Sequence, residues 1–146
     1  MKALSISDTL PNHKFEVIGG DSVWLKDLLS DKCVLTVMLP DCHECLVEAQ
    51  ELKSAISSPD DAKYFIFVTW ENPRTFEDMK VENGLTSPFL YDHKGGYFSK
   101  YDIHTFPFNI TLDSQGVVLD MLSGAMWKED FQKIIESNKL IGATTN

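Results

Sequence analysis

The sequence predicts an α/β fold in which helices flank a central β-sheet, and three features support this prediction. Short apolar runs alternate with longer, helix-patterned segments from Lys32 to the end of the chain, as in layered α/β proteins. The run at 33–39 is almost wholly apolar and rich in β-branched residues, which is typical of a central strand buried on both faces. A Cys-x-x-Cys unit follows this strand closely, where a helix is expected to begin.

The N-terminal segment predicts a β-hairpin. Two short β-prone runs, 14–17 and 22–25, flank the sequence Ile18-Gly19-Gly20-Asp21. A turn with two glycines between such runs indicates a hairpin. A helical turn is expected after it, at 27–30.

The segment after the central strand predicts an amphipathic helix. Pro40 ends the strand, and apolar residues then recur at spacings of three and four, at Leu46, Ala49, Leu52 and Ile56. This spacing places them on one helical face, so we expect a helix over 43–57, ended by Ser57-Ser58-Pro59-Asp60.

The remaining elements follow from the same patterns. Buried or β-prone runs predict strands at 64–70, 89–91, 108–112 and 117–122. Helical patterns predict helices at 73–81, with Pro73 in its first turn, and from Trp127 to near Asn138. The turn Asp113-Ser114-Gln115-Gly116 makes a hairpin of the last two strands.

The composition indicates a single globular domain spanning residues 1–146. A chain of 146 residues with 43% hydrophobic residues can bury a core without metal or disulfide staples. The net charge of -9 argues against nucleic acid or an anionic membrane as a partner, because both select for Lys and Arg. Residues 1–10 lack the apolar core of a signal peptide, and no stretch approaches the length of a membrane span.

The cysteines carry the candidate chemistry. The first thiol of the pair, Cys42, is expected at a helix N-terminus, where unpaired backbone N–H groups favour a thiolate. Cys45 lies one turn further on, close enough to form a disulfide with it. We therefore expect Cys42 to be the exposed nucleophile and Cys45 the buried resolving thiol. Cys33, at the start of the buried strand, is expected to be an inert small hydrophobe.

The neighbours of the pair leave its redox potential open. A cationic His43 would favour the Cys42 thiolate, whereas Asp41 and Glu44 would oppose it. A structural zinc site is an alternative reading of Cys-x-x-Cys. It would need two more ligands, and none of the available residues forms a second close pair: Cys33, His13, His93 and His104.

Glu48 follows Cys45 by three residues on the same predicted helix. This spacing brings the carboxylate within reach of the thiol pair, where it could accept a proton. Its alternative is an ordinary solvated glutamate on the helix face, because charged side chains are mostly exposed.

Four segments of the chain, taken in order, carry a family resemblance. They are 10–28, the heptapeptide Cys42-His43-Glu44-Cys45-Leu46-Val47-Glu48, the segment 101–107 that ends in Thr105-Phe106-Pro107, and 110–118. Respectively, they resemble the N-terminal hairpin, the Cys-x-x-Cys-x-x-Glu helix, the cis-proline segment and the following strand–turn–strand of the TlpA/ResA-like branch of the thioredoxin superfamily. The resemblance spans about 10–135.

The resemblance implies a thioredoxin-like fold, with a central mixed β-sheet flanked by helices and an N-terminal β-hairpin extension. It implies that Cys42 is the nucleophile, Cys45 the resolving cysteine and Glu48 a carboxylate near the thiols. Pro107 would be cis and packed against the disulfide. The backbone of Phe106 would then lie beside Cys42 and pair with an extended substrate segment.

The substrate-facing rim departs from the family pattern. Pro40-Asp41 stands where a pair containing Trp is expected, and the inter-cysteine residues His43 and Glu44 lack the usual proline. Thr36 stands where thioredoxins themselves keep a buried Asp, which is consistent with Glu48 as the carboxylate instead. We expect the substrate-binding residues to be Phe106, Pro107, His43 and Glu44.

The expected function is thiol–disulfide exchange with another protein, with the chain acting as the reductant. The resemblance implies no cofactor beyond the Cys42–Cys45 couple, no metal, and an extracytoplasmic bacterial setting, with a cytoplasmic one as the alternative. We expect a monomer.

Two other functions are kept as alternatives. A peroxiredoxin-like peroxidase is disfavoured because neither Cys42 nor Cys45 has the Pro-x-x-x-Thr/Ser-x-x-Cys context. A non-catalytic binding module would use the groove beside Phe106 and Pro107.

Overall fold

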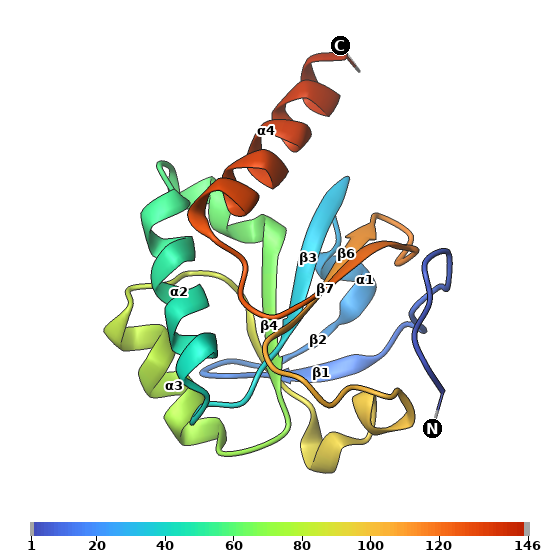
Figure 1. The fold of residues 1–146 in the computed structure, drawn as a ribbon, viewed down its shortest axis with the longest axis vertical. Helices are drawn as coiled ribbons and strands as arrows, with labels where there is room; N and C mark the ends of the chain where they lie inside the picture. The colour runs from blue at the N-terminus through green and yellow to red at the C-terminus, as the bar shows by residue number, and fades with distance from the viewer. Residues whose placement is uncertain (1, 145–146) are drawn as a thin grey trace.

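The computed structural model describes residues 2–144, which form a seven-stranded mixed sheet in the order β2-β1-β5-β4-β3-β6-β7 (Figure 1). The strands are β1 (Lys14–Val17), β2 (Ser22–Trp24), β3 (Lys32–Val37), β4 (Phe65–Thr69), β5 (Phe89–Tyr91), β6 (Phe108–Asp113) and β7 (Val118–Ser123). The helices are α1 (Leu25–Leu28), α2 (His43–Ala55), α3 (Pro73–Glu82) and α4 (Lys128–Thr144), with short 3-10 helices η1 (Pro59–Tyr64), η2 (His93–Gly95) and η3 (Phe98–Lys100). The predicted α/β fold is confirmed.

The pairing of the strands sets the position of the site. β3 pairs in parallel with β4 and antiparallel with β6, in a register that places Val37 opposite Phe108. The end of β3 and the start of β6 therefore meet at one edge of the sheet. The hairpin of β1 and β2 joins the sheet through antiparallel pairing of β1 with β5, which confirms the predicted N-terminal extension.

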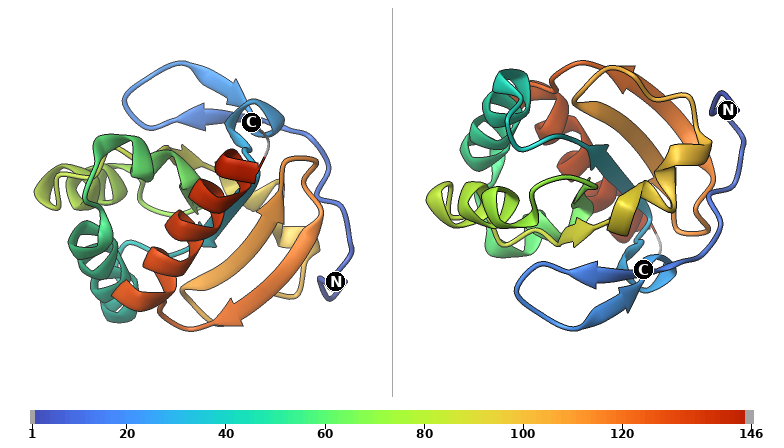
Figure 2. Two further views of the ribbon diagram at one scale, coloured as in Figure 1. Left: turned by 90° about the horizontal axis from the view of Figure 1, so that it is seen from above. Right: turned by 90° about the horizontal axis from the view of Figure 1, so that it is seen from below.

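Alternate residues of β3 enter two separate apolar layers. Val34 and Met38 pack with side chains from α2, α3 and α4, which cover one face of the sheet (Figure 2). Leu35 and Val37 pack into the opposite layer, which is covered by α1 and the segment around η3. Thr36 lies between Val34 and Met38 in the alternation, so its buried hydroxyl faces the helical layer.

The boundaries of several elements differ from those expected. The central strand ends at Val37, α2 ends at Ala55, and the first helical turn begins at Leu25. The last helix continues past Asn138 to Thr144. Asn138 does not end it because its side chain has tertiary partners: Nδ2 donates to the Lys32 carbonyl at 2.8 Å, and Oδ1 accepts from the Lys32 N–H at 3.0 Å. Within residues 2–144, none of the helices combines the length and apolar character needed to cross a membrane.

Candidate active site

Cys42 is the N-cap residue of α2. Its backbone is extended, with φ -83° and ψ 121°, and its Sγ accepts a hydrogen bond from the Cys45 N–H at 3.3 Å. The sulfur thus occupies the position at which a helix start offers unpaired N–H groups. Cys42 is half-buried, whereas Cys45, one turn into the helix, is fully buried. The expected difference in exposure between the two thiols is present.

The Phe106–Pro107 segment lies beside the thiols. The peptide bond between these two residues is cis, and the Cys42 thiol donates to the Phe106 carbonyl with an Sγ–O distance of 3.5 Å. The contact joins residues 64 positions apart in the chain. It follows from the register of β3 with β6, because one strand leads into the cysteine loop and the other begins directly after Pro107.

The rim of the site is polar and open. His43 and Glu44 are both exposed in the first turn of α2. A groove of about 410 Å³ separates this turn from α3, and the nine residues that line it are Pro40, Asp41, Cys42, His43, Leu46, Thr75, Asp78, Met79 and Glu82. Cys42 therefore borders a groove large enough to take part of another chain.

Glu48 is fully buried, so it is not the solvated glutamate that was the alternative reading. Its Oε1 accepts two hydrogen bonds, from Asn109 Nδ2 at 2.7 Å and from the Met126 N–H at 2.8 Å. Its Oε2 is also buried and has no hydrogen-bond partner among the described residues. Two hydrogen bonds therefore fix Oε1, whereas Oε2 has no such bond within residues 2–144 and can take a proton.

Burial changes the pKa values of Glu48 and Cys45, which both lie on α2. Burial, with a smaller contribution from the charge of Asp130, raises the pKa of Glu48 from 4.5 to about 7, after the opposing effects of the Met126 and Asn109 hydrogen bonds and of the nearby Thr36 hydroxyl are included. Burial also raises the pKa of the Cys45 thiol far above its usual range, with further contributions from Cys42 and from the charge of Glu48. Cys45 is therefore neutral at physiological pH and needs a base before it can react.

The raised pKa of Glu48 predicts a pH-dependent stability. A buried carboxyl that prefers its proton stabilises the fold fully below pH 4.5, and this contribution is lost as the pH rises through about 7. The difference between the two values corresponds to about 3 kcal/mol. We expect the free energy of unfolding, measured by urea titration, to be smaller at pH 8 than at pH 5. Glu48→Gln should flatten this dependence, and an equally steep dependence in the variant would contradict the assignment.

Two residues near the thiols were not predicted as part of the site. Asn109 is a buried polar residue in the apolar strand β6, which was the only local signal for its role. Trp70, at the end of β4, packs edge to face against Phe106 with a ring separation of 5.4 Å. Trp70 thus supplies an aromatic side chain at the site, where the family pattern would have a Trp just before the first cysteine and this chain has Pro40-Asp41.

Other candidate residues lie apart from the thiol pair. His104 is exposed and pairs with Asp102, and Cys33 is buried and accepts a hydrogen bond from the Ser30 N–H at 3.1 Å. Over residues 2–144, no group of three or more His, Cys, Asp or Glu side chains is arranged to hold a metal ion. The structure thus offers no support for the zinc alternative.

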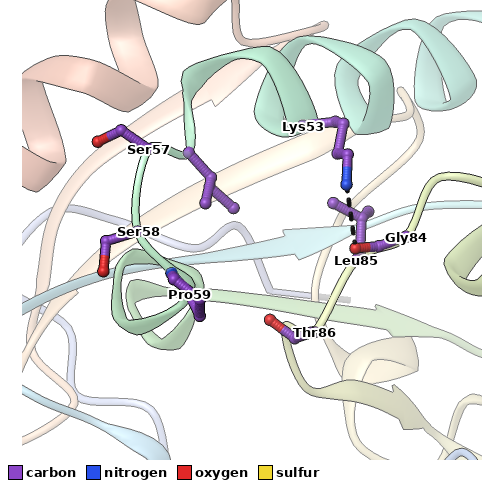
Figure 3. Close-up of a pocket in the computed structure, with 8 residues that line it drawn as sticks. Lys53, Ser57, Ser58, Pro59, Gly84, Leu85 and Thr86 are labelled. Atoms are coloured by element: carbon purple, nitrogen blue, oxygen red, sulfur yellow. Dashed lines mark hydrogen bonds between the residues drawn. The ribbon is translucent and has the colours of Figure 1, made fainter.

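A second pocket lies at the opposite end of α2, away from Cys42 (Figure 3). It has a volume of about 220 Å³ and lies between the last turn of α2 and the segment after α3. Lys53 Nζ reaches across it to the Gly84 carbonyl at 3.5 Å. Because Lys53 is in the last turn of the helix that Cys42 begins, this pocket does not contribute to the thiol site.

Comparisons with known proteins agree with this fold and dithiol. No family model matches the chain. A putative protein disulfide isomerase from Bacteroides thetaiotaomicron has the same fold, with a TM-score of 0.74 and 19% identity over 94% of this chain and 91% of that one. The thiol-disulfide oxidoreductase ResA of Geobacillus kaustophilus is 22% identical over 139 residues, which cover 94% of this chain and 80% of ResA.

These observations define the class of protein. The thioredoxin-like fold, with a Cys-x-x-Cys pair at the start of its active-site helix, makes the chain a thiol–disulfide oxidoreductase of the thioredoxin superfamily. Within that class it is similar to ResA, and also to the thioredoxin-like protein YneN of Bacillus subtilis, with 23% identity over 133 residues, or 86% of this chain and 76% of YneN. The predicted class and fold are confirmed.

Proposed function

We propose that this chain reduces disulfide bonds in other proteins, using Cys42 and Cys45 as the electron donors. The observation that carries the proposal is the unequal pair of thiols: Cys42 borders an open groove, whereas Cys45 is buried one turn behind it. The likeness to the thiol-disulfide oxidoreductase ResA supports this class of reaction, and a redox titration decides its direction.

The reaction would proceed in two exchanges. The Cys42 thiolate attacks one sulfur of the partner disulfide, which forms a mixed disulfide and releases the other partner sulfur as a thiolate. Glu48 then removes the proton from Cys45, whose thiolate attacks Cys42 Sγ. This forms the Cys42–Cys45 disulfide and releases the second partner thiolate. The enzyme loses two electrons and the partner disulfide gains them, so no other cofactor is required.

We assign the substrate contacts to the residues around Cys42. The Phe106 backbone, next to the buried Pro107, would pair with an extended segment of the partner. His43 and Glu44 are exposed on the first turn of α2, so they would contact the residues that flank the partner cysteine. The partner is a protein thiol or disulfide, and a non-catalytic module is disfavoured because both cysteines of the motif are present as thiols and Cys42 borders the groove.

The cellular setting is part of the same proposal. The likeness to ResA supports an extracytoplasmic bacterial location. We further propose that residues 1–146 act as one domain and as a monomer, because both cysteines, Glu48 and Phe106 come from one chain.

A redox titration of the Cys42–Cys45 couple would test this function. The protein is equilibrated in glutathione and dithiothreitol buffers, and the thiols are alkylated and counted by mass. A reversible two-electron transition near the thioredoxin range, about -270 mV, supports a reductant. A much higher potential would make the chain an oxidant or isomerase. The absence of any transition would refute the enzymatic role.

A further inference from the structure

Glu48 has no exposed surface, yet each turnover would require it to take up and release one proton. Its proton must therefore settle on one defined oxygen and reach solvent by a defined route. The contacts of the carboxyl group indicate which oxygen receives the proton. This inference rests on the proposed role of Cys45 as the resolving thiol.

Asn109 has a single allowed orientation in its network. Its Oδ1 accepts from Thr36 Oγ1 at 2.7 Å, so its amide nitrogen must point the other way. That nitrogen donates to Glu48 Oε1 at 2.7 Å and to the Gly124 carbonyl at 2.9 Å. A flipped amide would turn its oxygen toward two acceptors and lose the bonds to Glu48 Oε1 and to the Gly124 carbonyl.

The same network decides which oxygen of Glu48 carries the proton. Oε1 accepts from Asn109 and from the Met126 N–H, and a protonated oxygen would have to give up one of these bonds. Oε2 has no such donor in the described part of the chain. The proton therefore goes to Oε2.

A cleft reaches the fixed side of this carboxyl group. It has a volume of about 350 Å³, lies between β6, β7 and α4, and is lined by Lys32, Asn109, Thr111, Asp120, Met121, Leu122, Met126, Asp130, Lys133 and Ile134. Asn109 and Met126 both line this cleft, and both donate a hydrogen bond to Glu48 Oε1. The cleft and the groove at Cys42 share no lining residue.

We propose that Asn109 is a positioning residue which, together with the Met126 amide, fixes Glu48 so that Oε2 receives the Cys45 proton. In the exchange, the Cys45 S–H bond breaks and an O–H bond forms on Glu48. The Cys45 thiolate then displaces the partner thiolate from Cys42, and the Glu48 proton passes to water.

The groups around Glu48 allow a test in which two substitutions shift its pKa in opposite directions. Cys45 and Cys42 lie on the thiol side, and the cleft side carries Asp130 and Lys133 from α4, Asp120 from β7 and Lys32 from β3. Of these, the charge of Asp130 raises the pKa of Glu48, whereas the Asn109 hydrogen bond lowers it. Removing the charge of Asp130 should therefore lower the pKa of Glu48, and removing the Asn109 hydrogen bond should raise it.

The experiment uses reduced full-length protein and dithiobis-nitrobenzoate, an aryl disulfide that releases one thionitrobenzoate per exchange. The first release reports attack by Cys42, and the second reports resolution by Cys45. In the unmodified protein, we expect the rate of the second thionitrobenzoate release to rise with pH, with a midpoint near 7. Asn109→Leu should move this midpoint upward by about one pH unit, and Asp130→Asn downward by roughly half a unit, with the first release unchanged.

The controls separate this inference from the proposed function. Glu129→Gln changes the same charge at the exposed neighbouring position and should leave the midpoint in place. Asp130→Asn keeps an acceptor for the Trp127 N–H, so it tests the proposal even if Asn109→Leu fails to fold. A midpoint that is unchanged in Asp130→Asn, or shifted equally by Glu129→Gln, overturns the inference. Absence of the second release in the unmodified protein overturns the proposed function itself.

Discussion

Cys42→Ser is expected to abolish reduction of protein disulfides, by roughly 10⁴-fold or more, because a serine hydroxyl is a poor nucleophile at neutral pH. Cys45→Ala is expected to leave the first attack intact and to stop the reaction at the mixed disulfide, because no second thiol is close enough to resolve it. The measurement is turnover of a protein disulfide, with the trapped adduct identified by non-reducing electrophoresis and mass.

Cys33→Ala is the matched control for these two variants. Cys33 is also buried, but it lies at the start of β3 with Ser30 as its partner. Its removal should leave turnover unchanged. Equal disulfide reduction by Cys42→Ser and the unmodified protein would show that the chain is a binding module, and an adduct held by Cys45 in the Cys42→Ser variant would reverse the assigned roles.

Glu48→Gln is expected to slow the resolution of the mixed disulfide by about 10²-fold at pH 7, because general base catalysis contributes at least this factor. The amide keeps an acceptor for Asn109 and Met126 but cannot take the proton from Cys45. Single-turnover kinetics should show a normal first exchange and a slow second one. The rate of the slow step should then depend on hydroxide alone, without a midpoint near 7.

Glu51→Gln provides the comparison for this change. It removes the same charge from the same helix, three residues further on, and Gln can still accept the bond that Glu51 takes from the Lys128 N–H. We expect resolution at the unmodified rate in this variant. If Glu51→Gln slows the second exchange as much as Glu48→Gln does, the effect comes from the general charge of α2 rather than from a base at Glu48.

The secondary structure could be predicted from local patterns, and the deviations have local or tertiary causes. The two-residue alternation of β3 into both apolar layers explains why the run at 33–39 was recognisable as a central strand. The end of α4 was predicted too early because Asn138 is a poor helix residue in isolation. Its bonds to Lys32 link it to a strand 106 positions away, and no local pattern contains that contact.

The candidate site could be predicted in part. The Cys42 and Cys45 positions follow from a strand, a short loop and a helix that are contiguous in the chain, so their relative exposure was accessible from spacing alone. Phe106 and Pro107 were placed at the site by resemblance rather than by any pattern around them. Trp70 was read as a residue at a strand end, and its contact with Phe106 depends on how β4 and β6 lie in the sheet.

The α/β class, the order of the elements and the dithiol at the start of α2 could be predicted from the sequence, because each depends on residues within a few turns or one strand. The protonation and hydrogen bonding of Glu48 depend instead on the tertiary structure. Burial among packed segments raises its pKa, and its Oε1 is held by Asn109 and Met126, which are 61 and 78 positions away in the chain. The ionisation of a carboxyl group depends on the solvent and donors around it, and these are set by how distant segments pack.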